Sequence, residues 1–264
     1  MELLKQLREM TGAGMVDCKK ALDESNGDLN AAVELLRKKG IAKSAKRADR
    51  ETSEGVVAVA VNDDQTEGYA IEVNSETDFV ARSEKFQEFV NKSLELIKAK
   101  KPANVDELLA LEMDGSTVAD TLNTMSGVIG EKLAVKNIAV LQGATVAAYS
   151  HFGGHIGVLV SIDAAGKQEE ANDIAMQIAA ANPKYLVPAE VDPEEMEKEK
   201  NIYREQLIKE GKPAEMVEKI LAGKMSKYYS EVCLMEQEFI KDDKKKVKDI
   251  LGGANISAFV RFSL

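Results

Sequence analysis

The stretch Asn74-Ser75-Glu76-Thr77-Asp78-Phe79-Val80 lies where the hydrophobic pattern of the chain changes its period. Before it, apolar and polar residues alternate from Tyr69 to Asn74, which predicts a half-buried strand. After it, Ser83 precedes apolar residues at helical spacing, which predicts a capped amphipathic helix. These apolar residues are Phe86, Phe89, Val90, Leu94 and Ile97. We therefore expect Asp78 and Phe79 at a strand-to-helix junction on the edge of a sheet, where a side chain can project.

The spacing leaves two interpretations of Phe79 open. In the first, its ring packs under the following helix and Asp78 supports the first helical turn, since a phenylalanine near a helix start usually belongs to the core. In the second, the ring projects from the junction and contacts a partner.

Near its start the chain contains a second informative stretch, Leu7-Arg8-Glu9-Met10-Thr11-Gly12-Ala13-Gly14-Met15-Val16-Asp17-Cys18-Lys19-Lys20-Ala21-Leu22. This stretch resembles the N-terminal signature of the elongation factor Ts family, and Thr77-Asp78-Phe79-Val80 resembles a second signature of that family. The two matches occur in the expected order, and the resemblance runs from the first residues to the last. It implies guanine-nucleotide exchange on elongation factor Tu during translation, with no bond chemistry and no cofactor.

The resemblance also implies roles for single residues. Asp78 and Phe79, flanked by Thr77 and Val80, match the pair that enters between two helices of the partner's nucleotide domain and disturbs its magnesium site. Other matched positions contact the same partner; these are Arg8, Met15, Val16, Lys19 and His151. Val16 stands where some members have methionine, a mild change at an apolar contact. His155 stands where an arginine is common, which leaves its role open.

Composition places the chain among soluble globular proteins. Of its 264 residues, 44% are hydrophobic and 30% are charged, and the length allows one to three domains. Met1 leads directly into a charged amphipathic segment, so we expect no secretory signal. No apolar run approaches the roughly 20 residues that span a bilayer, so we expect no membrane partner. Cys18 and Cys233 fit no metal or redox spacing, which favours a reducing cytoplasm.

Charge is distributed unevenly along the chain. The formal net charge of −10 disfavours nucleic acid as the main partner, because phosphates would be repelled. Residues 1–50 are nevertheless net basic, which suggests two separate contact surfaces. Residues 41–54, with Lys43, Lys46 and Arg47, mix both signs of charge without interleaved aromatics, so we interpret them as a linker or a solvated helix extension.

The first 40 residues predict a small helical module. Apolar residues at helical spacing predict a helix over residues 2–10, and Gly12 and Gly14 permit a reversal after it. A second helix is expected to end near Ser25, and Asp28 is expected to cap a third helix that ends at Gly40. Three short helices in residues 1–40 resemble a ubiquitin-associated domain, a shape that binds partners and carries no chemistry.

Two related α+β halves are expected after the linker, over residues 55–142 and 143–264. Each half begins with a predicted strand hairpin, continues with helices and ends with a later third strand. Met113 falls in a helical stretch opened by Pro102, and Leu133 continues the next helix. In the last strand, 255–262, we expect Ile256, Ala258, Val260 and Phe262 on one face.

Residues 190–229 interrupt the second half. Two charged helices with a thin apolar seam, joined at Gly211-Lys212-Pro213, predict an antiparallel helical hairpin of the coiled-coil kind. Such an arm either packs on its own core or contacts another protein, and the resemblance implies self-association or partner contact. A homodimer through this hairpin is therefore possible.

Catalytic and metal sites find no support in the sequence. His151 and His155 flank Gly153-Gly154, which predicts a turn rather than a helical metal pair. No serine or cysteine stands in a nucleophile motif. The Gly-Lys pairs lack the following Ser or Thr of a phosphate-binding loop; they are Gly166-Lys167, Gly211-Lys212 and Gly223-Lys224. We therefore expect a non-enzymatic exchange factor, the alternative being a protein-binding scaffold or chaperone-like partner without exchange activity.

Overall fold

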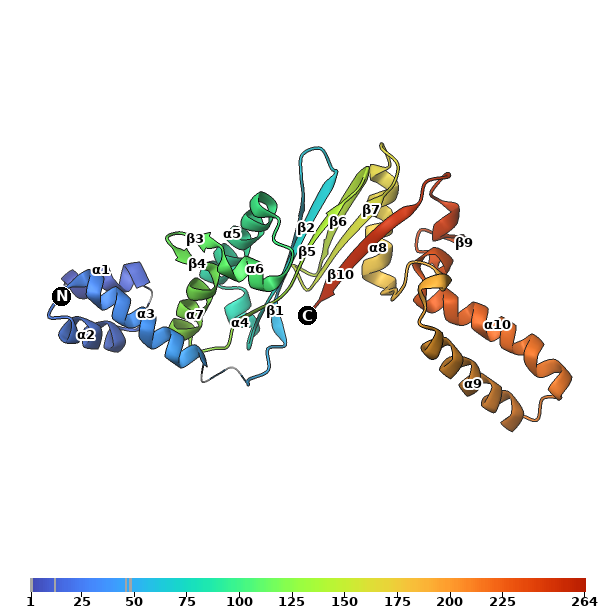
Figure 1. The fold of residues 1–264 in the computed structure, drawn as a ribbon, viewed down its shortest axis with the longest axis horizontal. Helices are drawn as coiled ribbons and strands as arrows, with labels where there is room; N and C mark the ends of the chain where they lie inside the picture. The colour runs from blue at the N-terminus through green and yellow to red at the C-terminus, as the bar shows by residue number, and fades with distance from the viewer. Residues whose placement is uncertain (1, 12, 46, 48) are drawn as a thin grey trace.

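The computed structural model describes residues 2–11, 13–45, 47 and 49–264, without the side chains of 41–45 and 214. The expectations placed on Gly12, on Lys46 and on the side chain of Lys43 lie outside the described residues. Along the long axis, a helical module, the core and a helical arm follow one another (Figure 1).

The N-terminal module consists of α1 (Glu2–Thr11), α2 (Met15–Glu24) and α3 (Leu29–Ala45). Its core is made by small and medium apolar side chains; the buried ones are Leu7, Ala13, Cys18, Ala21 and Ala32. Asp28 caps α3 as expected, because its Oδ1 accepts the backbone N–H groups of Asn30 at 2.9 Å and Ala31 at 3.0 Å.

The expectation that Gly40 ends the third helix is wrong. Helix α3 continues to Ala45, and Gly40 instead faces Gly127 on α7 (Val118–Ile129). A Cβ atom on Gly127 would lie 2.3 Å from the Cα of Gly40, so only glycines allow the two backbones to come this close. Arg37 on α3 also forms an ion pair with Asp120 on α7. The module is thus packed directly on the core, and α3 extends into the range expected to be a linker or a solvated helix extension.

Two antiparallel sheets of the same topology form the core within residues 49–264. The first contains β1 (Glu54–Val61), β2 (Glu67–Ser75) and β5 (Ala134–Gln142), in the order β1-β2-β5. The second contains β6 (Thr145–His151), β7 (Ile156–Ile162) and β10 (Ile256–Ser263), in the order β6-β7-β10. In each sheet the second strand of a hairpin lies between its partner and a late third strand, which confirms an α+β fold with antiparallel sheets.

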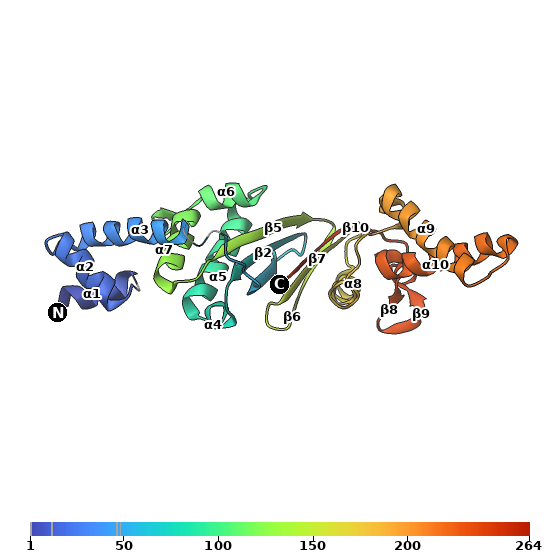
Figure 2. The same ribbon diagram turned by 90° about the horizontal axis from the view of Figure 1, so that it is seen from below.

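The sheets pack face to face, with helices on both outer faces (Figures 1 and 2). On the first sheet lie α4 (Asp78–Ala81), α5 (Glu84–Lys100), α6 (Val105–Ala110) and α7, and on the second lies α8 (Gln168–Ala181). The sheets approach so closely that a Cβ on Gly157 would lie 2.4 Å from Cγ1 of Val57. Met113 and Leu133 differ from expectation: Met113 lies in the short hairpin of β3 (Glu112–Met113) and β4 (Ser116–Thr117), and Leu133 follows the end of α7, where Gly130 has φ +91°.

The arm consists of α9 (Pro193–Lys209) and α10 (Ala214–Val232), which project from the far end of the core (Figure 1). After it, the sequence patterns missed the small hairpin of β8 (Glu238–Phe239) and β9 (Asp242–Lys246). Buried Gln177 on α8 holds this hairpin, because its Oε1 accepts the N–H of Ile240 at 2.8 Å. Ile256 is also misplaced in the sequence prediction: a bulge between Ile256 and Ala258 puts it on the α8 side of β10.

Candidate functional site

A single helical turn presents Phe79 to solvent. Helix α4 contains four residues, and Thr77 caps it by accepting the N–H of Val80 on Oγ1 at 3.4 Å. Val80 and Ala81 pack inward against the first-sheet core, whereas the side chain of Phe79 is 83% exposed. The interpretation that places this ring under the following helix is therefore wrong. Ser83 does not cap α5 with its side chain; its hydroxyl donates to the carbonyl of Val80 at 2.7 Å.

Asp78 lies beside Phe79 on the same turn. Its carboxylate is 3.2 Å from the guanidinium of Arg82, one turn further on. Both side chains are solvated, so this pair contributes little to stability and leaves the carboxylate accessible.

A small cleft separates this turn from the tip of the β6–β7 hairpin. The cleft has a volume of about 160 Å³; Asp78 and Arg82 line one side, and Phe152 and His155 line the other. Phe152 is 75% exposed. The backbone of the hairpin tip is fixed, because Val57 on β1 donates its N–H to the carbonyl of Gly154 at 2.6 Å. An exposed aromatic ring thus borders the cleft from the second sheet.

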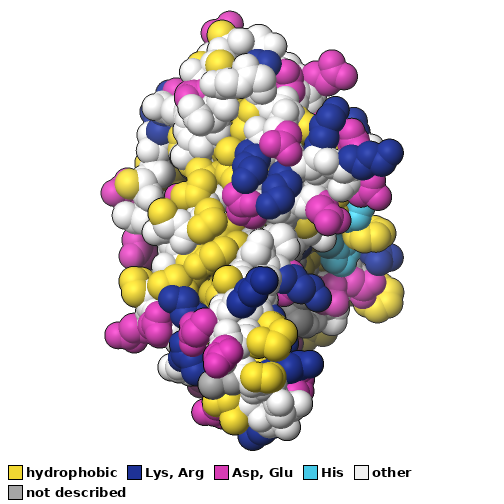
Figure 3. Space-filling model, turned by 90° about the vertical axis from the view of Figure 1, so that its right-hand side faces the viewer, with side chains coloured by type: hydrophobic (Ala, Val, Ile, Leu, Met, Phe, Trp, Pro, Cys, Tyr) yellow, Lys and Arg dark blue, Asp and Glu magenta, His cyan; other side chains and the backbone are white. Residues whose placement is uncertain are grey.

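His151 lies at the base of the same hairpin tip. Its Nδ1 is 2.9 Å from the hydroxyl of Tyr149, and its ring contacts that of Phe152 edge-on with centroids 4.1 Å apart. The histidine side chains gather with hydrophobic and acidic side chains at one edge of the molecule (Figure 3). In the part of the chain that the structure describes, no group of three or more His, Cys, Asp or Glu side chains is arranged to hold a metal ion.

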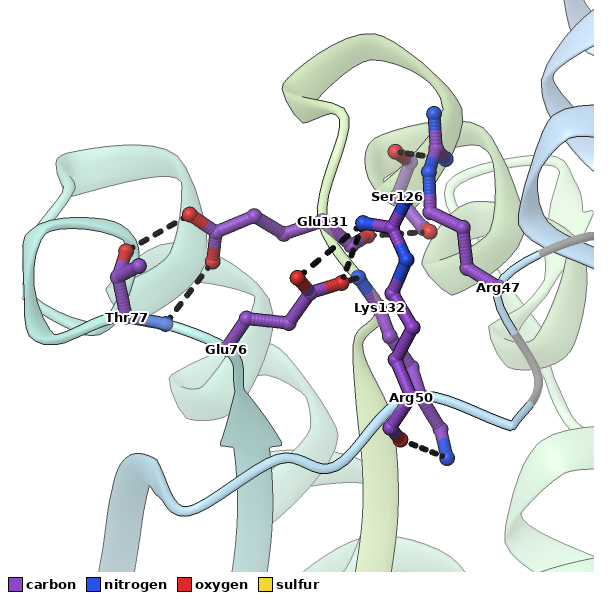
Figure 4. Close-up of polar contacts among 7 residues, drawn as sticks. All are labelled: Arg47, Arg50, Glu76, Thr77, Ser126, Glu131 and Lys132. Atoms are coloured by element: carbon purple, nitrogen blue, oxygen red, sulfur yellow. Dashed lines mark hydrogen bonds and ion pairs between the residues drawn. The ribbon is translucent and has the colours of Figure 1, made fainter.

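Glu76, just before the exposed turn, connects it to the segment that follows α3 and to the segment that precedes β5. The Glu76 carboxylate accepts the N–H of Lys132 at 2.5 Å and the guanidinium of Arg50 at 3.1 and 3.2 Å (Figure 4). Lys132 in turn donates its Nζ to the carbonyl of Arg50 at 2.8 Å. The hydrogen bond from the Lys132 backbone, followed by that from Arg50, holds the pKa of Glu76 below its ordinary value.

Glu131, between α7 and β5, binds the capping residue itself. Its Oε2 accepts the N–H of Thr77 at 3.0 Å and its Oε1 accepts the Thr77 hydroxyl at 2.7 Å (Figure 4). Ser126 on α7 donates its hydroxyl to the carbonyl of Glu131 at 2.6 Å, and Arg47 donates to the carbonyl of Ser126 at 3.1 Å. We call these six residues, Arg47, Arg50, Glu76, Ser126, Glu131 and Lys132, the clasp.

The N-terminal candidates form a second surface. Arg8 on α1 and Met15, Val16 and Lys19 on α2 are all exposed, Met15 to 59% and Val16 to 66%. Helices α1 and α2 lie at one end of the molecule, and α3 and α7 lie between them and α4 (Figures 1 and 2). The structure therefore brings Asp78, Phe79 and the His151 hairpin together, but not the α1–α2 residues.

Sequence reasoning missed the clasp and Phe152. A large aromatic next to Gly153-Gly154 in a predicted turn is a signal for an exposed ring, so Phe152 was detectable. Glu131 and Thr77 are 54 positions apart, and nothing in either local pattern announces their contact.

These features define a mixed helix-and-sheet protein that exposes apolar and charged side chains on a packed core. A family profile described as Elongation factor TS matches residues 76–264. Among curated relatives, elongation factor Ts of Deinococcus deserti is 44% identical over all of this chain and 99% of its own length. Elongation factor Ts of Prosthecochloris aestuarii is 43% identical over 99% of this chain and 96% of its own. The chain belongs to the elongation factor Ts family, which confirms the resemblance and its place in translation elongation.

Proposed function

We propose that this chain binds elongation factor Tu in its GDP-bound state and promotes GDP release, so that GTP can bind next. The observation that carries the proposal is the exposed Phe79 beside the solvated Asp78 on a capped turn, within a segment that the family profile covers. Nucleotide exchange breaks no covalent bond, so the proposed function needs neither a nucleophile nor a cofactor.

The proposed mechanism is thermodynamic linkage. A factor that weakens nucleotide binding must itself bind the nucleotide-free partner more tightly, by the same ratio. A nucleotide held at nanomolar affinity opposes release by about 12 kcal/mol, so several contacts must share the work. In this proposal Phe79 enters between two helices of the partner's nucleotide domain and Asp78 disturbs the magnesium site. Magnesium bridges the phosphates, so loss of its support loosens the whole nucleotide.

The other contacts belong to the same proposal. Thr77 and Val80 position the turn, His151 adds a contact from the second sheet, and the exposed α1–α2 residues hold the same nucleotide domain from a second surface; these are Arg8, Met15, Val16 and Lys19. Separate surfaces on one molecule raise the effective concentration of each contact once the other has formed.

We further propose the domain identities that the sequence suggested. Residues 1–40 would form a ubiquitin-associated-like module, extended by α3 through the start of the 41–54 segment, and residues 55–142 and 143–264 the core halves. Residues 190–229 would form a coiled-coil arm that permits a homodimer. In the described residues, no helix is both long and apolar enough to cross a bilayer. As the family acts in translation elongation, we place the chain in the cytoplasm.

The release of fluorescent GDP from elongation factor Tu tests the proposal. We expect the purified chain to accelerate release at substoichiometric concentration, because an exchange factor turns over. A chain that binds elongation factor Tu without changing the release rate would be a scaffold, and the proposal would be wrong.

A further inference from the structure

We propose that Glu131 and Glu76 are positioning residues, which orient the Phe79 turn and fix it relative to the N-terminal module. The inference rests on the proposed function for its consequence, but its structural basis is the clasp alone. Glu131 binds Thr77 directly, and Glu76 is the residue before Thr77 in the chain. Both glutamates therefore act on Phe79 through Thr77, the residue that caps α4.

Helix α4 needs external support. A helix gains stability from hydrogen bonds formed after its first turn, and α4 ends after four residues. The Thr77 hydroxyl has one proton, which it donates to Glu131, and a lone pair, which accepts the N–H of Val80. Because Glu131 also accepts the backbone N–H of Thr77, two charge-assisted bonds fix the capping residue in one orientation.

The same contacts hold together two segments of the core that connect helices and strands. Glu76 and Thr77 lie between β2 and α4, and Glu131 and Lys132 lie between α7 and β5. The bonding is reciprocal: Glu76 accepts from the backbone of Lys132, and Glu131 accepts from the backbone of Thr77. The Glu76 side chain is 23% exposed, so water screens these bonds only partly.

The clasp also reaches the N-terminal module. Arg47 and Arg50 follow α3, and they bind Ser126 and Glu76 respectively. Helix α3 packs on α7 at Gly40 and Gly127, so the module meets the core both through this helix crossing and through the clasp. A rotation of α3 about the crossing would therefore pull on Glu76, next to the cap of α4. The clasp thus sets the spacing between the α1–α2 surface and Phe79. In the proposed function both contact the same partner, so this spacing matters for exchange.

Amide hydrogen exchange of the free protein tests the positioning without any partner. We expect Glu131→Ala to speed exchange at Val80 and Ala81 about tenfold or more, since it removes both bonds to the cap. Glu131→Gln keeps an acceptor for the N–H and a donor for the hydroxyl, so it should restore most of the protection. Arg50→Ala should give a smaller increase at the same amides.

Glu67→Ala is the matched control at the opposite end of β2. Glu67 is also a partly buried carboxylate with several partners: it accepts from Tyr69 at 2.6 Å, Lys101 at 2.6 Å and Gln142 at 2.7 Å. We expect this change to leave the α4 amides as protected as in the unmodified chain. Unchanged protection of α4 in Glu131→Ala, or equal loss in Glu67→Ala, would overturn the positioning role.

A double-mutant cycle then tests the functional consequence. Glu131→Ala should lower the maximal rate of GDP release about tenfold, because a misplaced contact group loses most of its effect. In a Phe79→Ala background the same change should cause no further loss, since the residue acts through Phe79. Full additivity would reject action through Phe79. If the unmodified chain failed to accelerate GDP release, the proposed function would fall, while the hydrogen-exchange result would still decide the positioning role.

Discussion

Replacing Phe79 by alanine separates a contact residue from a core residue. A fully buried phenylalanine covers roughly 150–250 Å² of surface, and Phe79 is 83% exposed, so about one-sixth of that area is buried in the free protein. At about 25 cal/mol per Å², the change should cost about 1 kcal/mol of folding stability or less. A buried phenylalanine changed to alanine costs about 3–5 kcal/mol.

In the complex we expect the Phe79 ring to contribute more to binding than it contributes to folding stability. If the partner covers the exposed remainder of the ring, about 150 Å² of apolar surface leaves water, which is worth up to about 4 kcal/mol of interaction. Central aromatic contacts of this kind lose about 2 kcal/mol or more when truncated to alanine, which corresponds to about thirtyfold. In the proposed mechanism the ring contacts the partner's helices after they have parted, so we expect the loss in the maximal rate of GDP release more than in the concentration for half-maximal effect.

Phe86→Ala provides the matched control, since Phe86 on α5 is fully buried. Thermal melts and GDP-release rates would be measured for both variants at the same temperature, below either melting transition. We expect Phe79→Ala to melt close to the unmodified chain and to lose exchange, and Phe86→Ala to melt much lower. A large fall in the melting temperature of Phe79→Ala with unchanged exchange would refute the argument.

Other changes test the docking of α3 on the core, the role of the arm and the pH dependence of the arm root. Gly127→Ala should destabilise the docking of α3 and weaken exchange, whereas Gly223→Ala in α10, where an added Cβ meets nothing within 4 Å, should stabilise by about 0.5–1 kcal/mol; thermal melts compare the two. Replacing residues 194–228 by a short loop should leave circular dichroism of the core and substantial GDP release intact while weakening any self-association in sedimentation; complete loss of exchange in a folded variant would make the arm a primary contact. Hydrogen bonds from Tyr185 and Tyr228 hold the pKa of Glu195 below its ordinary value of 4.5, so their stabilisation of the arm root is present above that pH and is lost as pH falls through the lowered pKa. Hydrogen-exchange protection of α9 between pH 6 and 3 should show this loss, and Glu195→Gln should reduce it, while the part due to Glu197, whose pKa the hydrogen bond from Lys200 also lowers, should remain.

The elements with long, regular periodicity were predictable from the sequence, and one kind of failure occurs where one residue type serves two purposes. Gly40 illustrates this, because a glycine after an amphipathic run signals a helix end, but it also permits close helix packing. Only the presence of Gly127 on a distant helix distinguishes the two. Ile256 failed for a different reason: one extra residue in the bulge reverses the alternation, and no local pattern announces it.

The candidate site was predictable in its residues but not in its geometry. The resemblance pointed to Asp78 and Phe79, while spacing alone favoured burial of the ring and left its exposure open. Its orientation depends on Thr77, whose partner Glu131 lies on another connection of the fold. Such contacts are set by tertiary packing, which sequence periodicity does not contain.

The burial of both cysteines makes the native thiols separate reporters of unfolding. Cys18 lies in the core of the N-terminal module and Cys233 where the arm joins the body, and both are fully buried. Burial raises the pKa of the Cys233 thiol to about 11, which further suppresses the reactive thiolate. A short pulse of an alkylating reagent would therefore modify each thiol when its own surroundings open, and peptide mass spectrometry would assign the event to Cys18 or Cys233. The unmodified chain thus allows the melting of its two ends to be followed independently, and a fluorophore attached at an engineered surface cysteine would meet little competition from either native thiol.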